Sequence, residues 1–405
     1  MAPRSWCAAG ALLVAATLLA PAPARASSGR ELNLVPIAGG DSDVGIGVGQ
    51  VSDIASLTDA APPGFRWRLE SAAFITFKLR DSDLVVPFQD YYLQLAIPNL
   101  GPGRRLRLEI RPAFTNESTL KYYGIGNASP RPALPVAGVE YERMHPTFSV
   151  EARVRVFERF YGLVGTGFTY NRLDVPANTL LAQQQANGPP EVRALLGNFD
   201  PHGVALLTAE AQWDTRDDET VTTHGQFHTL RFRWSPHIGD ALPYPYQRTT
   251  LTTRFYTEPI DRWLTVAWRV VGDVLWGSPP FYELARFDET GAIGGGKAVR
   301  GVPGQRYYGK AKLFGNLEVG SQLLPFKIKT KQLVLGLAAF FDGGRSWTEL
   351  GRAHPELDGT GLGLKYGVGG GLRLRQGRTF VVRFDVAWSP DAEPVGAYFA
   401  AGQIF

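Results

Sequence analysis

Cysteine is almost missing from this sequence, because its 405 residues contain only Cys7. Cys7 precedes an apolar run, residues 8–20, that follows the basic Arg4 and ends before a small-residue site at residues 24–26. This pattern predicts a secretory signal peptide over residues 1–26, with cleavage before Ser27. An exported chain that loses its only cysteine in this way is not a small disulfide-stapled scaffold.

Long apolar runs and an excess of one charge are also missing. After residue 26, no apolar stretch reaches the length of about 18 residues that a membrane-spanning helix needs. Lys and Arg number 42 and Asp and Glu number 38. Nucleic-acid binders concentrate basic charge on one face, so this near balance excludes nucleic acid as an expected partner.

Catalytic and metal-binding signatures are missing as well. None of the six histidines lies in a nucleophile motif, and no metal-ligand spacing, phosphate loop or dinucleotide fingerprint occurs. His224 and His228 are four residues apart, but a strand does not bring that spacing to one point as a helix does. We therefore expect no enzyme, no cofactor and no metal site.

What the sequence does contain is alternation with period two. Residues 105–111 alternate apolar and charged side chains, and residues 150–156 and 382–388 do the same. The polar positions are repeatedly Arg, Glu or Asp, while the apolar face ends in aromatic residues, as at Trp388. A soluble β-sandwich also alternates, but lipid outside and a charged, wet lumen inside explain this pattern better. We expect an all-β fold, a transmembrane antiparallel β-barrel in the outer membrane of a Gram-negative bacterium.

Sixteen strands are expected, an even number as bacterial barrels require. The last one ends in the aromatic Phe405, which suits the end of a barrel. Short turns should alternate with long outer loops at 117–146, 174–202, 276–309 and 345–362. The expected strands are 33–39, 44–52, 66–79, 88–98, 104–116, 147–157, 160–173, 203–214, 226–236, 246–257, 263–275, 310–324, 332–344, 363–375, 379–389 and 395–405.

Six short segments in this order resemble one family, the bacterial surface antigen superfamily of sixteen-stranded barrels that includes BamA, TamA and the two-partner secretion transporters. Each segment alone is a weak signal, but six in order are specific. They are YYGIGN (122–127), WDTRDD (213–218), PFYEL (280–284), GGGKAVRG (294–301), GNLE (315–318) and FFDGGRSW (340–347).

The resemblance implies a latch inside the barrel. In this family the sixth outer loop folds into the lumen, and an arginine at its tip meets acidic residues on the twelfth and thirteenth strands. Arg300 would be that arginine, and Glu318 and Asp342 would be the acids. Val299, Gly301, Phe340 and Gly344 complete the matching motifs, whereas Val302 and Pro303 stand where an aromatic residue is usual. Without the family pattern, Arg300 would be interpreted as a solvated loop residue.

The function implied by the resemblance is insertion or translocation of proteins, or of lipid, at the outer membrane. Family members usually have periplasmic POTRA domains before the barrel, and we expect none here, since residues 27–405 are assigned to the barrel. A weak seam between the first and last strands, marked by Pro36 and Phe405, would serve that function; alternatively, Pro36 simply begins its strand. Expected partners are outer-membrane lipid including lipopolysaccharide, unfolded client outer-membrane proteins, and a separate periplasmic POTRA protein or chaperone. The alternative is a passive pore or structural surface antigen that lost insertase activity.

Overall fold

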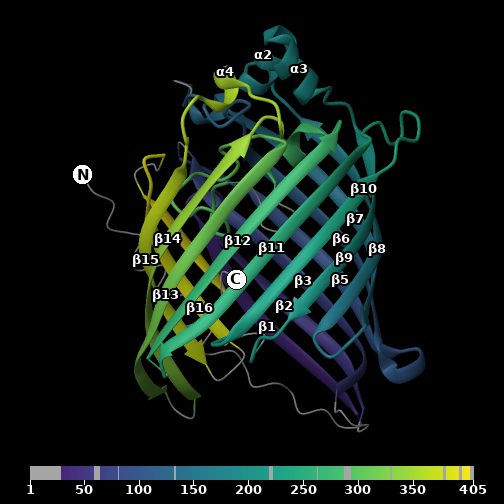
Figure 1. Ribbon diagram of the computed structural model, residues 1–405, viewed down its shortest axis with the longest axis vertical. Coiled ribbons are helices and arrows are strands. Elements are labelled where there is room, and N and C mark those ends of the chain that lie inside the picture. Colours follow the sequence, from purple (N-terminus) through teal and green to yellow (C-terminus); the bar gives the residue numbers. More distant parts are fainter. Residues whose placement is uncertain are drawn as a thin grey trace.

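The computed structural model describes residues 29–58, 64–80, 82–131, 134–218, 222–261, 263–286, 293–328, 331–376, 380–391 and 395–401. In these residues, sixteen long antiparallel strands form one closed β-barrel, which confirms the expected fold and strand number (Figure 1). The barrel strands are β1 (Arg30–Asp41), β2 (Gly45–Thr58), β3 (Gly64–Arg80), β5 (Phe88–Leu100), β6 (Leu106–Lys121), β7 (Glu140–Arg155), β8 (Phe160–Asp174), β9 (His202–Asp214), β10 (Gly225–Ser235), β11 (Tyr246–Ile260), β12 (Leu264–Gly277), β13 (Ala311–Ile328), β14 (Lys331–Trp347), β15 (Lys365–Gln376), β16 (Phe380–Trp388) and β17 (Gly396–Ala401).

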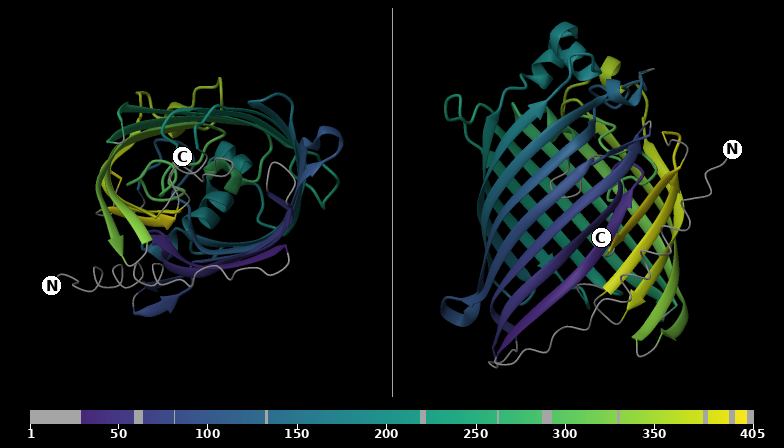
Figure 2. Two further views of the ribbon diagram at one scale, coloured as in Figure 1. Left: turned by 90° about the horizontal axis from the view of Figure 1, so that it is seen from below. Right: turned by 180° about the vertical axis from the view of Figure 1, so that it is seen from behind.

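The remaining strand, β4 (Asp83–Val85), is a short extension that pairs only with the end of β3. Each barrel strand pairs with its neighbour along the chain, and β1 pairs with β17 to close the ring. Figure 2 shows the first strands, in purple, beside the last strands, in yellow.

Alternating side chains give each strand a lipid face and a lumen face. On β10, Leu230, Phe232 and Trp234 are exposed on the outside of the barrel. Between them, Arg231 points to the lumen and forms an ion pair with Glu210 of the neighbouring strand β9. The period of two in the sequence therefore reflects lipid on one side and a polar interior on the other.

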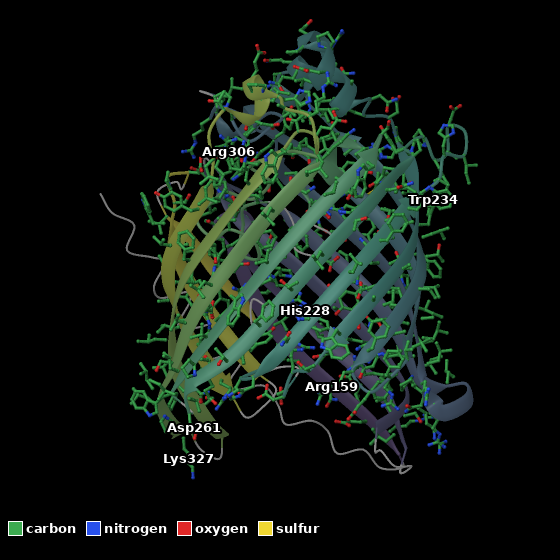
Figure 3. All side chains as sticks on the ribbon, viewed as in Figure 1. Arg159, His228, Trp234, Asp261, Arg306 and Lys327 are labelled. Atoms are coloured by element: carbon green, nitrogen blue, oxygen red, sulfur yellow. The ribbon has the colours of Figure 1, made fainter. Side chains whose placement is uncertain are left out.

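The two ends of the barrel differ. Arg159, Asp261 and Lys327 lie at the end with short turns, and Arg306 lies towards the opposite end, which has the long loops (Figure 3). These outer loops contain the helices α2 (Leu180–Asn187), α3 (Pro190–Leu196) and α4 (Pro355–Asp358). Within the described ranges, no helix is long and apolar enough to cross a bilayer.

The first long outer loop is shorter than the sequence predicts. The loop expected at 117–146 begins only after Lys121 and ends at Glu140, so β6 and β7 both extend further. Tyr141 and His145, in the added part of β7, are buried. The strands β6 and β7 continue there because outer loops pack against their inner faces. Side chains in this part no longer alternate between lipid and lumen, so the period of two in the sequence does not mark it as strand.

An apolar cap closes the outer end of the barrel. It combines α2 and α3 with the short 3-10 helix η3 (Phe281–Ala285) and with side chains of the upper strands. Its buried members are Leu120, Tyr122, Ile125, Tyr141, Leu181, Val192, Leu196, Val204, Tyr246, Leu275, Phe281, Tyr282, Leu284, Ala285 and Tyr308. Below the cap the lumen is polar, with a cavity of about 290 Å³ that Arg153, Arg231 and Arg254 help to line.

Candidate functional site: the loop 6 latch and the β1–β17 seam

Loop 6 joins β12 to β13, and its described parts, residues 278–286 and 293–310, run inside the ring of strands (Figure 2). Side chains of the wall hold its backbone in place. Asn316 donates from Nδ2 to the carbonyl oxygen of Ala298 at 2.6 Å, and Arg269 donates from Nη2 to the carbonyl oxygen of Lys297 at 2.6 Å. The loop therefore approaches its tip along β12 and β13.

Arg300, at this tip, is fully buried and faces three carboxylates. Its Nε and Nη2 donate to the two oxygens of Asp342 on β14 at 2.7 and 3.0 Å. Its Nη1 donates to Glu318 on β13 at 3.0 Å and to Asp385 on β16 at 3.2 Å. We call these four residues the latch. The structure brings together the three latch residues named from the sequence and adds Asp385.

The supporting motif residues lie around the guanidinium. The Arg300 Cζ atom is 3.3 Å from the centre of the Phe340 ring, a cation–π contact. Gly301 has a φ of +92°, the left-handed region that favours glycine. A Cβ at Gly344 would lie 2.7 Å from the Cβ of Phe314, so this glycine lets β13 and β14 pack closely.

Two further arginines surround the latch carboxylates. Arg373 on β15 donates to Glu318 at 2.8 Å and to Asp385 at 2.5 Å. Arg383 on β16 donates to Asp385 at 3.0 Å. The cluster then holds three guanidinium groups and three carboxylates, so its formal charge is zero. A balanced, hydrogen-bonded cluster is the form in which buried charge is tolerated.

The charge of Arg300 is strongly favoured in this environment. Burial by itself would lower the Arg300 pKa, but hydrogen bonding to Asp342 and the negative charges of Asp342, Glu318 and Asp385 raise that pKa above its usual value. The guanidinium offers five donors in a rigid fork, which lets one side chain bind several carboxylates at once.

The tip of loop 6 has Val302 and Pro303 where the family usually has an aromatic residue, and neighbouring side chains fill that space. Val299 and Val302 are fully buried in one apolar cluster. Tyr398 of β17 accepts the backbone N–H of Gly301 at its hydroxyl oxygen, at 2.8 Å. A Cβ at Gly296 would lie 2.8 Å from the Tyr398 ring, so loop 6 passes directly against this tyrosine.

Among the described residues of the barrel wall, β1 and β17 form the junction with the fewest paired residues. Within the described residues, the two strands pair only at Gly40 with Phe399 and at Asp41 with Tyr398. By contrast, β1 pairs with β2 at every one of its residues. Ala400 pairs with β16 but has no partner on β1. The pairing that the structure describes, as far as Ala401 of β17, lies at the outer end.

Of the two residues expected to mark the seam, the structure describes one. Pro36 lies inside β1, opposite Gln50 of β2, with its side chain exposed. It does not begin its strand, which starts six residues earlier at Arg30. Phe405 and the expected signal peptide lie outside the described residues.

A model of the Omp85 superfamily domain matches residues 138–405 of this sequence. The chain belongs to the Omp85 superfamily. This match confirms the resemblance to surface-antigen barrels and the location in the outer membrane. Omp85 barrels are in general transporters and insertases without enzymatic activity.

Solved structures show the same fold. BamA from Haemophilus ducreyi lacking POTRA domains 1-3 is 13% identical, with a TM-score of 0.61 over 93% of this chain and 71% of that chain. CdiB from Escherichia coli is 13% identical, with a TM-score of 0.54 over 93% of this chain and 64% of that one. Among curated proteins, none matches the sequence.

Besides the latch motifs and PFYEL, which forms most of η3 in the cap, two further motifs of this Omp85 chain have structural positions. In WDTRDD, Arg216 forms an ion pair with Asp214 at 2.7 Å, and Asp217 accepts hydrogen bonds from the turn before β10. In YYGIGN, Ile125 forms a bridge with Tyr308 of loop 6, and Asn127 donates to Gly363. Both motifs fix loops.

Sequence reasoning missed four residues of this Omp85 site: Arg373, Arg383, Asp385 and Tyr398. Arg383 and Asp385 are visible in the sequence as the charged face of an alternating strand. That they face Arg300 depends on the curvature of the barrel, which no local pattern reports. Within the described part of the chain, no three His, Cys, Asp or Glu side chains are grouped to hold a metal ion.

Proposed function

We propose that this Omp85 barrel assists the insertion or translocation of proteins, or of lipid, at the outer membrane through the β1–β17 seam. One observation supports this above all: in the described residues, the seam is paired at only two positions, both at its outer end. The unpaired edge of a strand presents N–H and C=O groups that can template an incoming strand.

The cap supports a lateral route over a route straight through the lumen. Leu181 of α2 and Phe281 of η3 are buried within the apolar cluster that crosses the outer end. A polypeptide passing along the barrel axis would have to displace that packed cluster. A strand adding to β1 would leave it in place.

In this proposal, the latch holds loop 6 in place while the seam accepts an incoming client strand. The partners would be outer-membrane lipid including lipopolysaccharide around the apolar wall, unfolded client outer-membrane proteins at the seam, and a separate periplasmic POTRA protein or chaperone that delivers the clients. Residues 27–405 would form the barrel after removal of a signal peptide at residues 1–26.

The test is to refold the mature protein into liposomes and add an unfolded client outer-membrane protein. Client folding is followed by its heat-modifiable gel shift, against empty liposomes and an unrelated barrel of similar size. A parallel assay uses outer-membrane vesicles supplemented with periplasmic extract, in case delivery needs a partner. Acceleration that is lost in Arg300→Ala would support the proposal.

No acceleration in either assay would overturn it. A steady, large ion conductance of the same protein in planar bilayers would then support the alternative, a passive pore. Absence of both activities would support a structural surface antigen.

A further inference from the structure

The tip of loop 6 contacts β17 and the turn that follows β1 at once. On one side, the N–H of Gly301 donates to the Tyr398 hydroxyl of β17 at 2.8 Å. On the other side, the N–H of Gly304 donates to Oδ2 of Asp43, in the turn between β1 and β2, at 2.8 Å. Only two residues of chain separate Gly301 from Gly304, so the tip spans the seam.

Both anchors are rigid. Tyr398 is almost fully buried and packs with Phe340 and Ala387 beneath the latch. Asp43 is held by the turn itself, in which Asp41 accepts the backbone N–H groups of Asp43 and Val44 at 2.8 and 2.9 Å. A tip fastened to two rigid anchors restricts their separation.

The anchors also coincide with the only described pairing of the seam. Asp41 pairs with Tyr398, and the N–H of Ser42 donates to the carbonyl oxygen of Ala397 at 3.1 Å. Lys121 of β6 adds an ion pair to Asp43 at 3.1 Å, which ties the same turn to the wall beyond it. The described part of the seam is therefore closed where loop 6 crosses it.

We infer that Asp43 and Tyr398 are positioning residues through which the seated tip of loop 6 clasps β1 and β17 together, so that release of the Arg300 latch frees the outer end of the seam. The clasp extends the proposed function and rests on it, because only that function says what an open seam would do. The clasp itself is a statement about conformation. It can therefore be tested separately from client insertion.

The first experiment measures hydrogen exchange by mass spectrometry on the full-length mature protein in lipid. In the double variant Asp43→Ala/Tyr398→Phe, exchange at residues 40–42 and 396–398 should rise about tenfold while β7–β9 stays unchanged. The matched control is Tyr122→Phe, which removes the hydroxyl of an equally buried tyrosine that bonds Gln184 of the cap at 2.7 Å. Unchanged seam exchange in a folded double variant would overturn the inference.

The second experiment does not depend on a destabilised variant. A Cβ at position 304 would lie 3.6 Å from the Asp43 Cγ, a spacing that suits a disulfide between Asp43→Cys and Gly304→Cys. Since Cys7 is the only native cysteine, no other pairing competes in the mature chain. Oxidation should slow exchange at residues 40–42 and 396–398, and reduction should restore it.

These outcomes separate the two ideas. Slower seam exchange without any loss of client folding would support the clasp and contradict a seam-based function. Slower exchange together with reversible loss of client folding would support both. An equal rate of hydrogen exchange at the seam in the oxidised and the reduced protein would contradict the clasp, whatever the client assay shows.

Discussion

Gly367 of β15 and the backbone of Arg300 occupy adjoining space, because a Cβ at position 367 would collide with the Arg300 carbonyl oxygen. The glycine is thus what allows loop 6 to lie against the barrel wall at the latch. Gly369, two residues further on the same face, similarly makes room for the Phe340 ring. The glycine-rich sequence of β15 provides the seat of the tip.

We expect Gly367→Ala to displace the tip while leaving the strand intact. Overpacking of a close contact costs about 1–3 kcal/mol, and the loop is the part that can move. Limited proteolysis should cut residues 293–310 faster than in the wild type, and the heat-modifiable unfolding temperature should fall. Gly370→Ala is the control, since Gly370 is exposed on the same strand. Equal protection of residues 293–310 from proteolysis in Gly367→Ala and Gly370→Ala would contradict this explanation.

Removal of the latch arginine should have the largest effect. Arg300→Ala leaves three buried or nearly buried carboxylates with too few donors, and breaking a buried ion pair costs about 3–5 kcal/mol. We expect a lower unfolding temperature of the barrel and faster proteolysis of loop 6. Arg300→Lys should recover only part of the loss, because an ammonium group cannot serve three carboxylates from a fixed fork. Full recovery of the unfolding temperature in Arg300→Lys would show that the positive charge alone, without the geometry of the guanidinium, stabilises the latch.

Asp385 should behave as an equal member of the latch. Asp385→Asn removes one negative charge from a balanced cluster and leaves Arg373 and Arg383 with a weaker partner. A double-mutant cycle with Arg373→Gln should show coupling of about 0.5–3 kcal/mol in unfolding free energy. Asp90→Asn is the control, since Asp90 bonds Thr115 on β6, away from the latch. Additive effects of Asp385→Asn and Arg373→Gln would show that these two residues do not stabilise the protein as one cluster.

Acid should loosen the cap through Glu283. Burial tends to raise the Glu283 pKa, but the positive charge of Arg248, 2.7 Å away, and those of Arg143 and Arg286 hold that pKa below its usual value of 4.5. A lowered folded-state pKa stabilises the protein above pH 4.5, and this stabilisation is lost as the pH falls through the folded-state pKa.

The unfolding temperature of the wild type should therefore drop more than that of Glu283→Gln between about pH 6 and about pH 3. The variant should already be less stable at neutral pH, because it lacks the charge that Arg248 pairs with. Parallel pH profiles of the two proteins would mean that Glu283 does not set the acid sensitivity of the cap.

Most of the barrel could be predicted from the sequence because lipid and water impose a simple rule on each strand. Leu230, Phe232 and Trp234 alternate with charged or polar neighbours, and the strand follows from that pattern alone. The rule fails beyond the membrane, where β7 begins at Glu140 and its buried side chains face a protein cap. The helices α2 and α3 were also missed, although Thr179 caps the first and Pro190 opens the second.

The site could be predicted only where a motif fixes a local geometry. Arg300, Glu318 and Asp342 lie in short segments that resemble the family, and the structure places them in contact. Asp385 and Tyr398 are 85 and 98 residues from Arg300 in sequence, and their approach depends on how the ring of strands closes. Alternation marks them as strand residues and gives no information about which loop they meet.

The composition of the latch has a consequence for how the barrel itself is made. Its carboxylates come from β13, β14 and β16, and its second arginine layer comes from β15 and β16. These strands all follow Arg300 in the sequence, and the latch is complete only when β13, β14, β15 and β16 are all in place. Contacts between distant parts of a chain form late because of their loop-closure entropy. We therefore expect loop 6 to seat only after these strands have closed around it, so that a seated loop reports that the C-terminal wall is complete.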